Sequence, residues 1–308
     1  MPVLRSVILG LSQNRSLRNF CERSRVGQRL SSRFVAGPAI EDAIAVTQAL
    51  NSQGIAVTLD SLGESVTSEV EAHHAADVYH RLLNWIASSK AQAHISVKLT
   101  QIGLNLNPNL AQSIAEGLAR HAREAGSFMR IDMEESRLTQ ITLDIARRLY
   151  AIGDLRGSVG VVIQAYLYRS EGDIDQLIVE GIPVRLCKGA YKEPAEIAFP
   201  RKADVDKNYL RLAGKLIESR CQPAFATHDG AIIKTLKHLA KDSRVYRGRF
   251  EFQMLYGIRR DLQRSLAARR YPVRVYVPFG PEWYPYFMRR IAERPANALF
   301  LARNIFRS

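Results

Sequence analysis

A regular alternation of two kinds of segment constrains the fold of this chain most. Along the 308 residues, eight short stretches rich in β-branched and aliphatic residues alternate with segments of helical periodicity. The short stretches are nearly continuous apolar runs, as is typical of strands that are buried on both faces of a parallel sheet. The sequence therefore predicts eight successive βα units. The predicted strands are 55–59, 94–99, 128–132, 159–165, 183–187, 223–227, 250–255 and 273–277.

The continuity of these units favours a single closed barrel. No change of composition and no linker rich in Pro, Gly or Ser divides the chain, which favours an α/β fold of the (β/α)8 type over a doubly wound open sheet. No Gly-x-Gly-x-x-Gly follows a predicted strand, so the Rossmann fingerprint is missing. We expect residues 1–54 to form a helical arm, with a helix at 40–53 over the N-terminal mouth of the barrel. Residues 55–308 should form the barrel, with arm and barrel as one folding unit.

The charge balance is strongly basic. The chain holds 44 Lys and Arg against 30 Asp and Glu, a formal net charge of +14. Such a surface is either simply solvated or attracts anionic lipid headgroups or nucleic acid. Basic residues gather near the N-terminus and again at Arg244, Arg247 and Arg249, without interleaved aromatics or a helix-turn-helix pattern. We therefore expect peripheral contact with an anionic membrane surface and no nucleic-acid partner.

Targeting signals and cysteine use indicate the cytoplasm. No apolar stretch approaches the roughly 18–20 residues that cross a bilayer, and the first residues lack a small-residue cleavage site. Cys21, Cys187 and Cys221 are widely spaced and form no Cys-x-x-Cys pair. This argues for a reducing compartment and against a disulfide framework or a zinc site. We expect a cytoplasmic protein that associates peripherally with the inner face of the membrane.

Polar residues end or follow most of the predicted strands. In a (β/α)8 barrel the C-terminal strand ends meet at one mouth, where the chemistry is built. So many polar side chains at one mouth are hard to explain by packing alone. In chain order they are Ser96, Lys98, Arg130, Asp132, Gln164, Arg185, Lys188, Thr227, His228, Asp229 and Tyr276.

Each of these residues also has a purely structural interpretation. Lys98 could pair with Asp132 on the neighbouring strand, although desolvation offsets much of the attraction within a buried pair. A single histidine such as His228 is more often a satisfied core residue than a catalyst, but its place after a strand, in Ala-Thr-His-Asp, favours function. No metal site is predicted, because one helical segment gathers acidic and histidine side chains without the His-Glu-x-x-His order. These side chains are Glu71, His73, His74 and His80.

The last predicted helix carries two adjacent arginines, Arg289 and Arg290, shortly after a strand-end tyrosine. Guanidinium groups bind carboxylates through two parallel hydrogen bonds, so paired arginines at a barrel mouth are suited to clamp a carboxylate. Tyr286, three residues before Arg289, shares its helix face. An exposed helix with internal ion pairs would not explain the aromatic residues in the same turn.

These motifs together resemble the proline dehydrogenase family, in its stand-alone bacterial form. The resemblance runs in order from about residue 34 to 305 and covers every βα unit. It is carried by Phe34-Val-Ala-Gly37, Leu62-Gly-Glu64, Ser96-Val-Lys98-Leu, Ile131-Asp-Met-Glu134, Val162-Ile-Gln-Ala-Tyr166, Val184-Arg-Leu-Cys-Lys-Gly-Ala-Tyr191, Ala226-Thr-His-Asp229, Phe250-Glu-Phe-Gln253, Val273-Arg-Val-Tyr276 and Tyr286-Phe-Met-Arg-Arg290.

The resemblance implies a distorted TIM-type barrel, with the last helix over the mouth and FAD held non-covalently. It implies that Lys98, Arg289 and Arg290 hold the carboxylate of proline, and that Tyr276, Tyr286 and Leu255 pack on its ring. Asp132 and Arg185 would be the catalytic residues, with Asp132 beside Lys98 and Arg185 close to flavin N5, and Glu64 would act as a gate. The implied FAD contacts are Met133, Gln164, Arg185, Lys188, Gly189, Ala190, Thr227 and His228.

The implied reaction is the oxidation of L-proline to Δ¹-pyrroline-5-carboxylate by hydride transfer from C5 to flavin N5. The electrons would pass to a quinone, and a pyrroline-5-carboxylate dehydrogenase would act next in proline degradation. Two other interpretations stay open. One is an aldolase-like barrel that forms a Schiff base on Lys98 or Lys188. The other is a basic barrel that binds RNA without catalysis.

Overall fold

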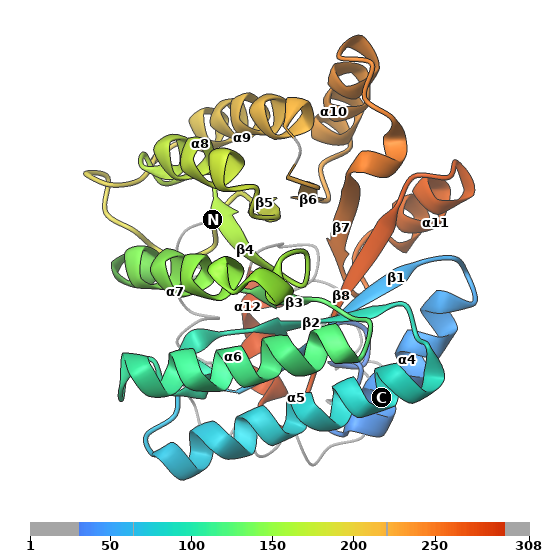
Figure 1. Ribbon diagram of the computed structural model, residues 1–308. Coiled ribbons are helices and arrows are strands. Elements are labelled where there is room, and N and C mark those ends of the chain that lie inside the picture. The colour runs from blue at the N-terminus through green and yellow to red at the C-terminus, as the bar shows by residue number, and fades with distance from the viewer. Residues whose placement is uncertain (1–30, 64, 220, 293–308) are drawn as a thin grey trace.

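The computed structural model describes residues 31–63, 65–219 and 221–292, apart from the side chains of Arg289, Ile291 and Ala292 (Figure 1). In this part of the chain, eight parallel strands form a closed barrel in which each strand pairs with the next and β1 pairs with β8. The predicted barrel is therefore confirmed, and each predicted strand overlaps an observed one. The strands are β1 (Ala56–Ser61), β2 (Ala93–Val97), β3 (Met129–Ile131), β4 (Val159–Gln164), β5 (Val184–Cys187), β6 (Ala224–Ala226), β7 (Glu251–Leu255) and β8 (Val273–Phe279).

Helices follow the strands and cover the outside of the barrel, because each buries an apolar face, as Leu118 and Ala122 do in α6. Polar caps fix their starts: the carboxylate of Asp229 accepts the N–H groups of Ala231 and Ile232 at the start of α10. The outer helices are α5 (Glu69–Ser89), α6 (Pro108–Glu124), α7 (Thr139–Ala151), α8 (Ser170–Glu180), α9 (Lys202–Glu218), α10 (Gly230–Asp242) and α11 (Arg260–Ala268). Short 3-10 helices lie at Leu99–Ile102, Ser136–Leu138, Gly153–Leu155 and Arg247–Arg249.

Two helices depart from the regular arrangement. The helix after β8, α12 (Trp283–Ala292), does not join the wall but crosses the C-terminal mouth, and in Figure 1 it lies inside the ring of outer helices. There Phe287 packs against Phe34, with ring centroids 6.2 Å apart. The vacant place in the wall is taken by α4 (Ile40–Asn51), which packs along β1 and β8. The prediction that this helix covers the N-terminal mouth was wrong, because its buried face packs against the outer side of β1 and β8.

A layer of buried charged side chains lies inside the barrel. Arg274 donates from Nε to Glu251 (3.0 Å) and from Nη1 to the Val57 carbonyl (2.8 Å). Arg130, expected at the mouth, turns into the interior instead and donates from Nη1 to the Pro183 carbonyl (2.7 Å). Burial lowers the pKa of Arg130 to about 9. Burial would raise the pKa of Glu251, but the charges and hydrogen bonds around it, those of Arg274 first among them, together lower that pKa to about 2. Arg130 and Glu251 therefore both stay charged at neutral pH.

Gly160 on β4 leaves the space that Arg130 occupies, because a Cβ there would lie 2.5 Å from Arg130 Nη1. We expect Gly160→Ala to lower the free energy of unfolding in urea by about 1–3 kcal/mol, since an overpacked interior must shift. Gly117→Ala on the exposed face of α6, where a Cβ meets nothing within 4 Å, should instead raise it by about 0.5–1 kcal/mol. Wild-type stability of Gly160→Ala would contradict this packing of Arg130.

Candidate active site

The C-terminal ends of the strands enclose a cavity of about 730 Å³. The site residues predicted from the sequence line it together, with two exceptions: Glu64 lies outside the described residues, and the side chain of Arg289 is not described. The predicted residues in its wall are Lys98, Asp132, Met133, Gln164, Arg185, Lys188, Gly189, Ala190, Thr227, His228, Leu255, Tyr276, Tyr286 and Arg290.

The carboxylate of Asp132, directly after β3, connects four strands at this mouth. Its Oδ1 accepts hydrogen bonds from Ser96 Oγ (2.8 Å) and Arg185 Nη1 (2.7 Å), and its Oδ2 accepts one from the Tyr276 hydroxyl (2.8 Å). The Arg185 guanidinium also lies 5.4 Å from the centroid of the Tyr276 ring. Burial, and after it the Asp132 charge, raises the pKa of Tyr276 well above its ordinary value, so the phenol remains a donor. Asp132 therefore fixes the orientation of both Arg185 and Tyr276.

Lys98 pairs with a residue that the sequence analysis did not select. Its ammonium lies 2.5 Å from Oδ1 of Asp60 on β1, and not against Asp132 as expected. Burial alone would lower the pKa of Lys98, but the carboxylates of Asp60 and Asp132 outweigh burial and raise it to about 12. Burial raises the pKa of the Asp60 carboxyl, and Lys98 opposes that rise. The signal for Asp60 was present in the sequence, since Asp60 stands near the end of its strand as Lys98 and Asp132 do.

The wall formed by the residues after β5 and β6 is fixed by its own polar contacts. The Lys188 ammonium lies 2.5 Å from Asp206 and 3.6 Å from Asp229. The Nε2 atom of His228 accepts the N–H of Leu255 (2.9 Å), so the neutral ring carries its proton on Nδ1. Asp206 is a second residue that the sequence analysis missed, because it lies inside α9 and is far in the sequence from the end of any strand.

The helix α12 closes the other side of the cavity. Tyr286 is buried there, and the guanidinium carbon of Arg290 lies 5.1 Å from the centroid of its ring. Together with Lys98 and Arg185, Arg290 gives the cavity cations from β2, β5 and α12. Such a convergence of charged donors is suited to an anionic ligand, because charge-assisted hydrogen bonds are stronger than neutral ones.

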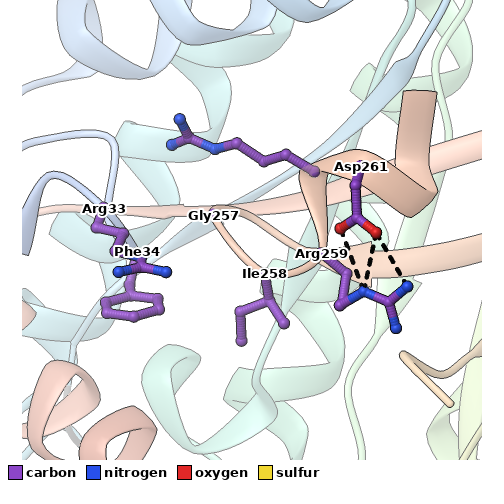
Figure 2. A pocket seen from close by; sticks show the side chains of 7 residues that line it. Arg33, Phe34, Gly257, Ile258, Arg259 and Asp261 are labelled. Carbon is purple, nitrogen blue, oxygen red and sulfur yellow. Dashed lines mark hydrogen bonds and ion pairs between the residues drawn. The ribbon is translucent and has the colours of Figure 1, made fainter. Parts of the chain in front are cut away.

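A second cavity of about 510 Å³ lies beside the first, and Arg259 lines both. Figure 2 shows the Arg259 guanidinium bound to the carboxylate of Asp261, with Nη2 3.0 Å from Oδ2. The wall of the second cavity contains none of the predicted site residues, so the first cavity is the candidate active site. The wall residues are Arg33, Phe34, Gly257, Ile258, Arg259, Arg260 and Asp261.

The raised pKa of Lys98 has a chemical consequence that can be tested. An amine must be uncharged to form a Schiff base, and a pKa of about 12 keeps Lys98 protonated at neutral pH. We expect a small carbonyl compound with borohydride at about pH 8 to leave Lys98 unmodified in peptide mass spectrometry. A reduced adduct on Lys98 would contradict the Asp60 pairing and support the aldolase-like mechanism.

Comparison with known proteins extends over nearly the whole chain. A family model described as Proline dehydrogenase matches residues 43–303. The chain is 42% identical over 307 residues to Proline dehydrogenase 1 of Bacillus subtilis subsp. natto, which covers 99% of this chain and 100% of that protein. It is also 42% identical to Proline dehydrogenase of Deinococcus radiodurans, over 90% of each chain.

A solved structure agrees with the fold. The crystal structure of proline utilization A (PutA) from Bdellovibrio bacteriovorus matches with a TM-score of 0.82 and 26% identity over 87% of this chain. This chain spans about a third of that longer protein, since the match covers 33% of it. From the family model, the full-length relatives and the shared barrel, it follows that the chain belongs to the proline dehydrogenase family.

Proposed function

We propose that this protein oxidises L-proline to Δ¹-pyrroline-5-carboxylate with FAD as the electron acceptor, the hydride leaving C5 of proline for flavin N5. The proposal rests on one observation: cations that follow β2 or lie on β5 and α12 line the same cavity as the residues at the strand ends. Membership of the proline dehydrogenase family supports the substrate and the class of reaction. The aldolase-like interpretation loses support at Lys98, because that amine is held protonated.

One observation in particular indicates that the cavity can bind a flavin. The Nε atom of Arg185 is buried and has no hydrogen-bond partner in the described part of the chain, while Nη1 of the same group donates to Asp132. A buried donor without a partner costs free energy, so this one is suited to an acceptor on a bound molecule. When bound, FAD supplies the acceptor for the two electrons that leave proline. We assign its binding to Met133, Gln164, Arg185, Lys188, Gly189, Ala190, Thr227 and His228.

The substrate is held, in this proposal, by its carboxylate and its ring. Lys98 and Arg290 line the cavity and bind the carboxylate, and Arg289 completes the clamp. Tyr276, Tyr286 and Leu255 contact the ring and exclude water from it. Asp132 acts as a positioning residue through Arg185 and Tyr276, and Asp60 does so through Lys98. Glu64 is proposed as a gate over the bound substrate. The protein thus supplies orientation, which accounts for much of the acceleration in such reactions.

We further propose that the electrons pass to a quinone and that a pyrroline-5-carboxylate dehydrogenase consumes the product as proline is degraded to glutamate. The proposed location is the cytoplasm, with peripheral contact to the inner face of the membrane. None of the described helices is long and apolar enough to cross a bilayer. We also propose that residues 1–54 and 55–308 fold as one unit, which the packing of α4 on β1 and β8 supports.

The purified protein should contain FAD, and anaerobic addition of L-proline should bleach its visible absorption band. D-Proline should not, because a carboxylate clamp combined with ring contacts fixes one face of the substrate. The cofactor released by denaturation should have the mass of FAD. A colourless protein that gains no activity on addition of FAD would overturn the proposed function.

The clamp predicts that proline and an unreactive carboxylate analogue lose affinity together. Tetrahydro-2-furoic acid keeps the carboxylate and the ring, so it should inhibit competitively. Lys98→Met and Arg290→Met should each weaken inhibitor and proline by a similar factor, roughly 30-fold or about 2 kcal/mol for one charge-assisted contact. Lys234→Met on the exposed face of α10 should change neither. An inhibition constant that stays at the wild-type value while KM rises would show that the residue does not hold the carboxylate.

A further inference from the structure

The end of the barrel opposite the active site carries a cluster of cations on two neighbouring loops. One loop connects α10 to β7 and the other connects α11 to β8 (Figure 1). All the cations are exposed, and in the described part of the chain none of them forms an ion pair. Acids also occur in this region: Asp242 follows Lys241, Glu218 accepts a hydrogen bond from Ser243 Oγ (3.3 Å), and Glu251, two residues after Arg249, is paired with Arg274. We call the cluster the basic face; it comprises Lys241, Arg244, Arg247, Arg249, Arg269 and Arg270.

Two of these arginines occupy backbone positions that favour glycine. Arg244 (φ 55°) follows the end of α10, and Arg270 (φ 60°) follows the end of α11. Each turn is closed by a hydrogen bond back into its helix. In the first turn the N–H of Val245 donates to the Ala240 carbonyl (2.8 Å), and in the second the N–H of Tyr271 donates to the Leu266 carbonyl (3.1 Å). Glycine is usual at this position, since a Cβ is unfavourable in the left-handed region. Neither turn therefore needs an arginine for folding.

The two loops are held in a fixed relation to each other. Arg247 Nη1 donates to the Arg269 carbonyl (2.9 Å), across the gap between the loops. The ring of Tyr271 is covered by Arg247 and by Lys237, at 5.6 and 4.6 Å from its centroid. The two loops therefore present their cations on the same side of the barrel. Close to them, Tyr246 is 74% exposed, a position in which an amphipathic ring suits a water–lipid boundary.

We infer that the basic face docks on an anionic lipid surface. The inference rests on the proposed membrane contact and names the surface that makes it. Charge complementarity identifies the occupant, because clusters of four to eight Lys and Arg residues beside exposed aromatics bind anionic headgroups. Loop tips that project from one end of a barrel suit a flat surface, whereas single-stranded nucleic acid is bound in a groove with stacked bases. The strands separate this face from the cavity, so docking leaves the mouth open.

The test is co-sedimentation of the full-length protein with vesicles of phosphatidylcholine containing 30% phosphatidylglycerol. The variant Arg244→Gly/Arg270→Gly/Arg249→Gln should lower the partition coefficient on the order of 100-fold, at about fivefold for each cation. Its melting temperature should be equal to or above that of the wild type, because glycine relieves two left-handed positions. Loss of binding thus cannot be attributed to unfolding.

Arg137→Gln/Arg201→Gln is the control: it removes two exposed cations, one fewer than the test variant, from the mouth end of the barrel. It should bind as the wild type does, and pure phosphatidylcholine vesicles should bind neither protein. Equal binding of the variant and the wild type, or tighter binding of the wild type to a single-stranded oligonucleotide than to the vesicles, would overturn the inference. The assay contains no proline or electron acceptor, so its outcome is independent of the FAD content and turnover that test the proposed function.

Discussion

The carboxylate of Asp132 holds the mouth of the barrel together, because its two oxygens accept hydrogen bonds from residues of three other strands. Each charged or aromatic donor also serves the cavity. The hydroxyl of Tyr276 satisfies the carboxylate while its ring forms part of the wall, and Arg185 neutralises the charge while its Nε has no hydrogen-bond partner in the described structure. A poorly solvated carboxylate is costly without such donors, and loss of one leaves charge uncompensated. A change at Asp132 would therefore disturb the proposed substrate wall and the proposed cofactor wall together.

The position of α12 is the second constraint, and it explains that of α4. By alternation, Val57 and Leu59 of β1 point away from the barrel interior, as do Val275 and Val277 of β8, and all four are fully buried. In a regular barrel the helix after the last strand would cover them. Because α12 instead crosses the mouth with Arg290 and Tyr286, another apolar helix face must take its place. The segment before β1 supplies it, with Ala43 and Thr47 buried. Helix α4 is thus part of the wall, and the C-terminal mouth of the barrel gains a helix.

Local patterns were sufficient for the strands, since eight apolar runs bounded by turns leave little choice of pairing. Local patterns did not predict how deep a side chain lies in the barrel or which charged group it pairs with. Arg130 and Asp132 point to the same side of β3, but a rise of roughly 3.3 Å per residue puts Arg130 one layer below the mouth. Lys98 had carboxylates on both sides, on β1 and after β3. It pairs with Asp60 because Asp132 already accepts three other donors, a competition that no single strand reveals.

The distribution of charge separates the two ends of the molecule. At the mouth the cations meet acids: Lys98 lies against Asp60, Arg185 against Asp132, and Lys188 against Asp206. At the other end exposed arginines stand together without such partners in the described structure. Like charges held together oppose folding, and at two of these positions glycine would suit the backbone better. Part of the net charge of +14 therefore lies where neither folding nor the proposed chemistry requires it. A role outside the cavity, on a surface with its own partner, accounts for it.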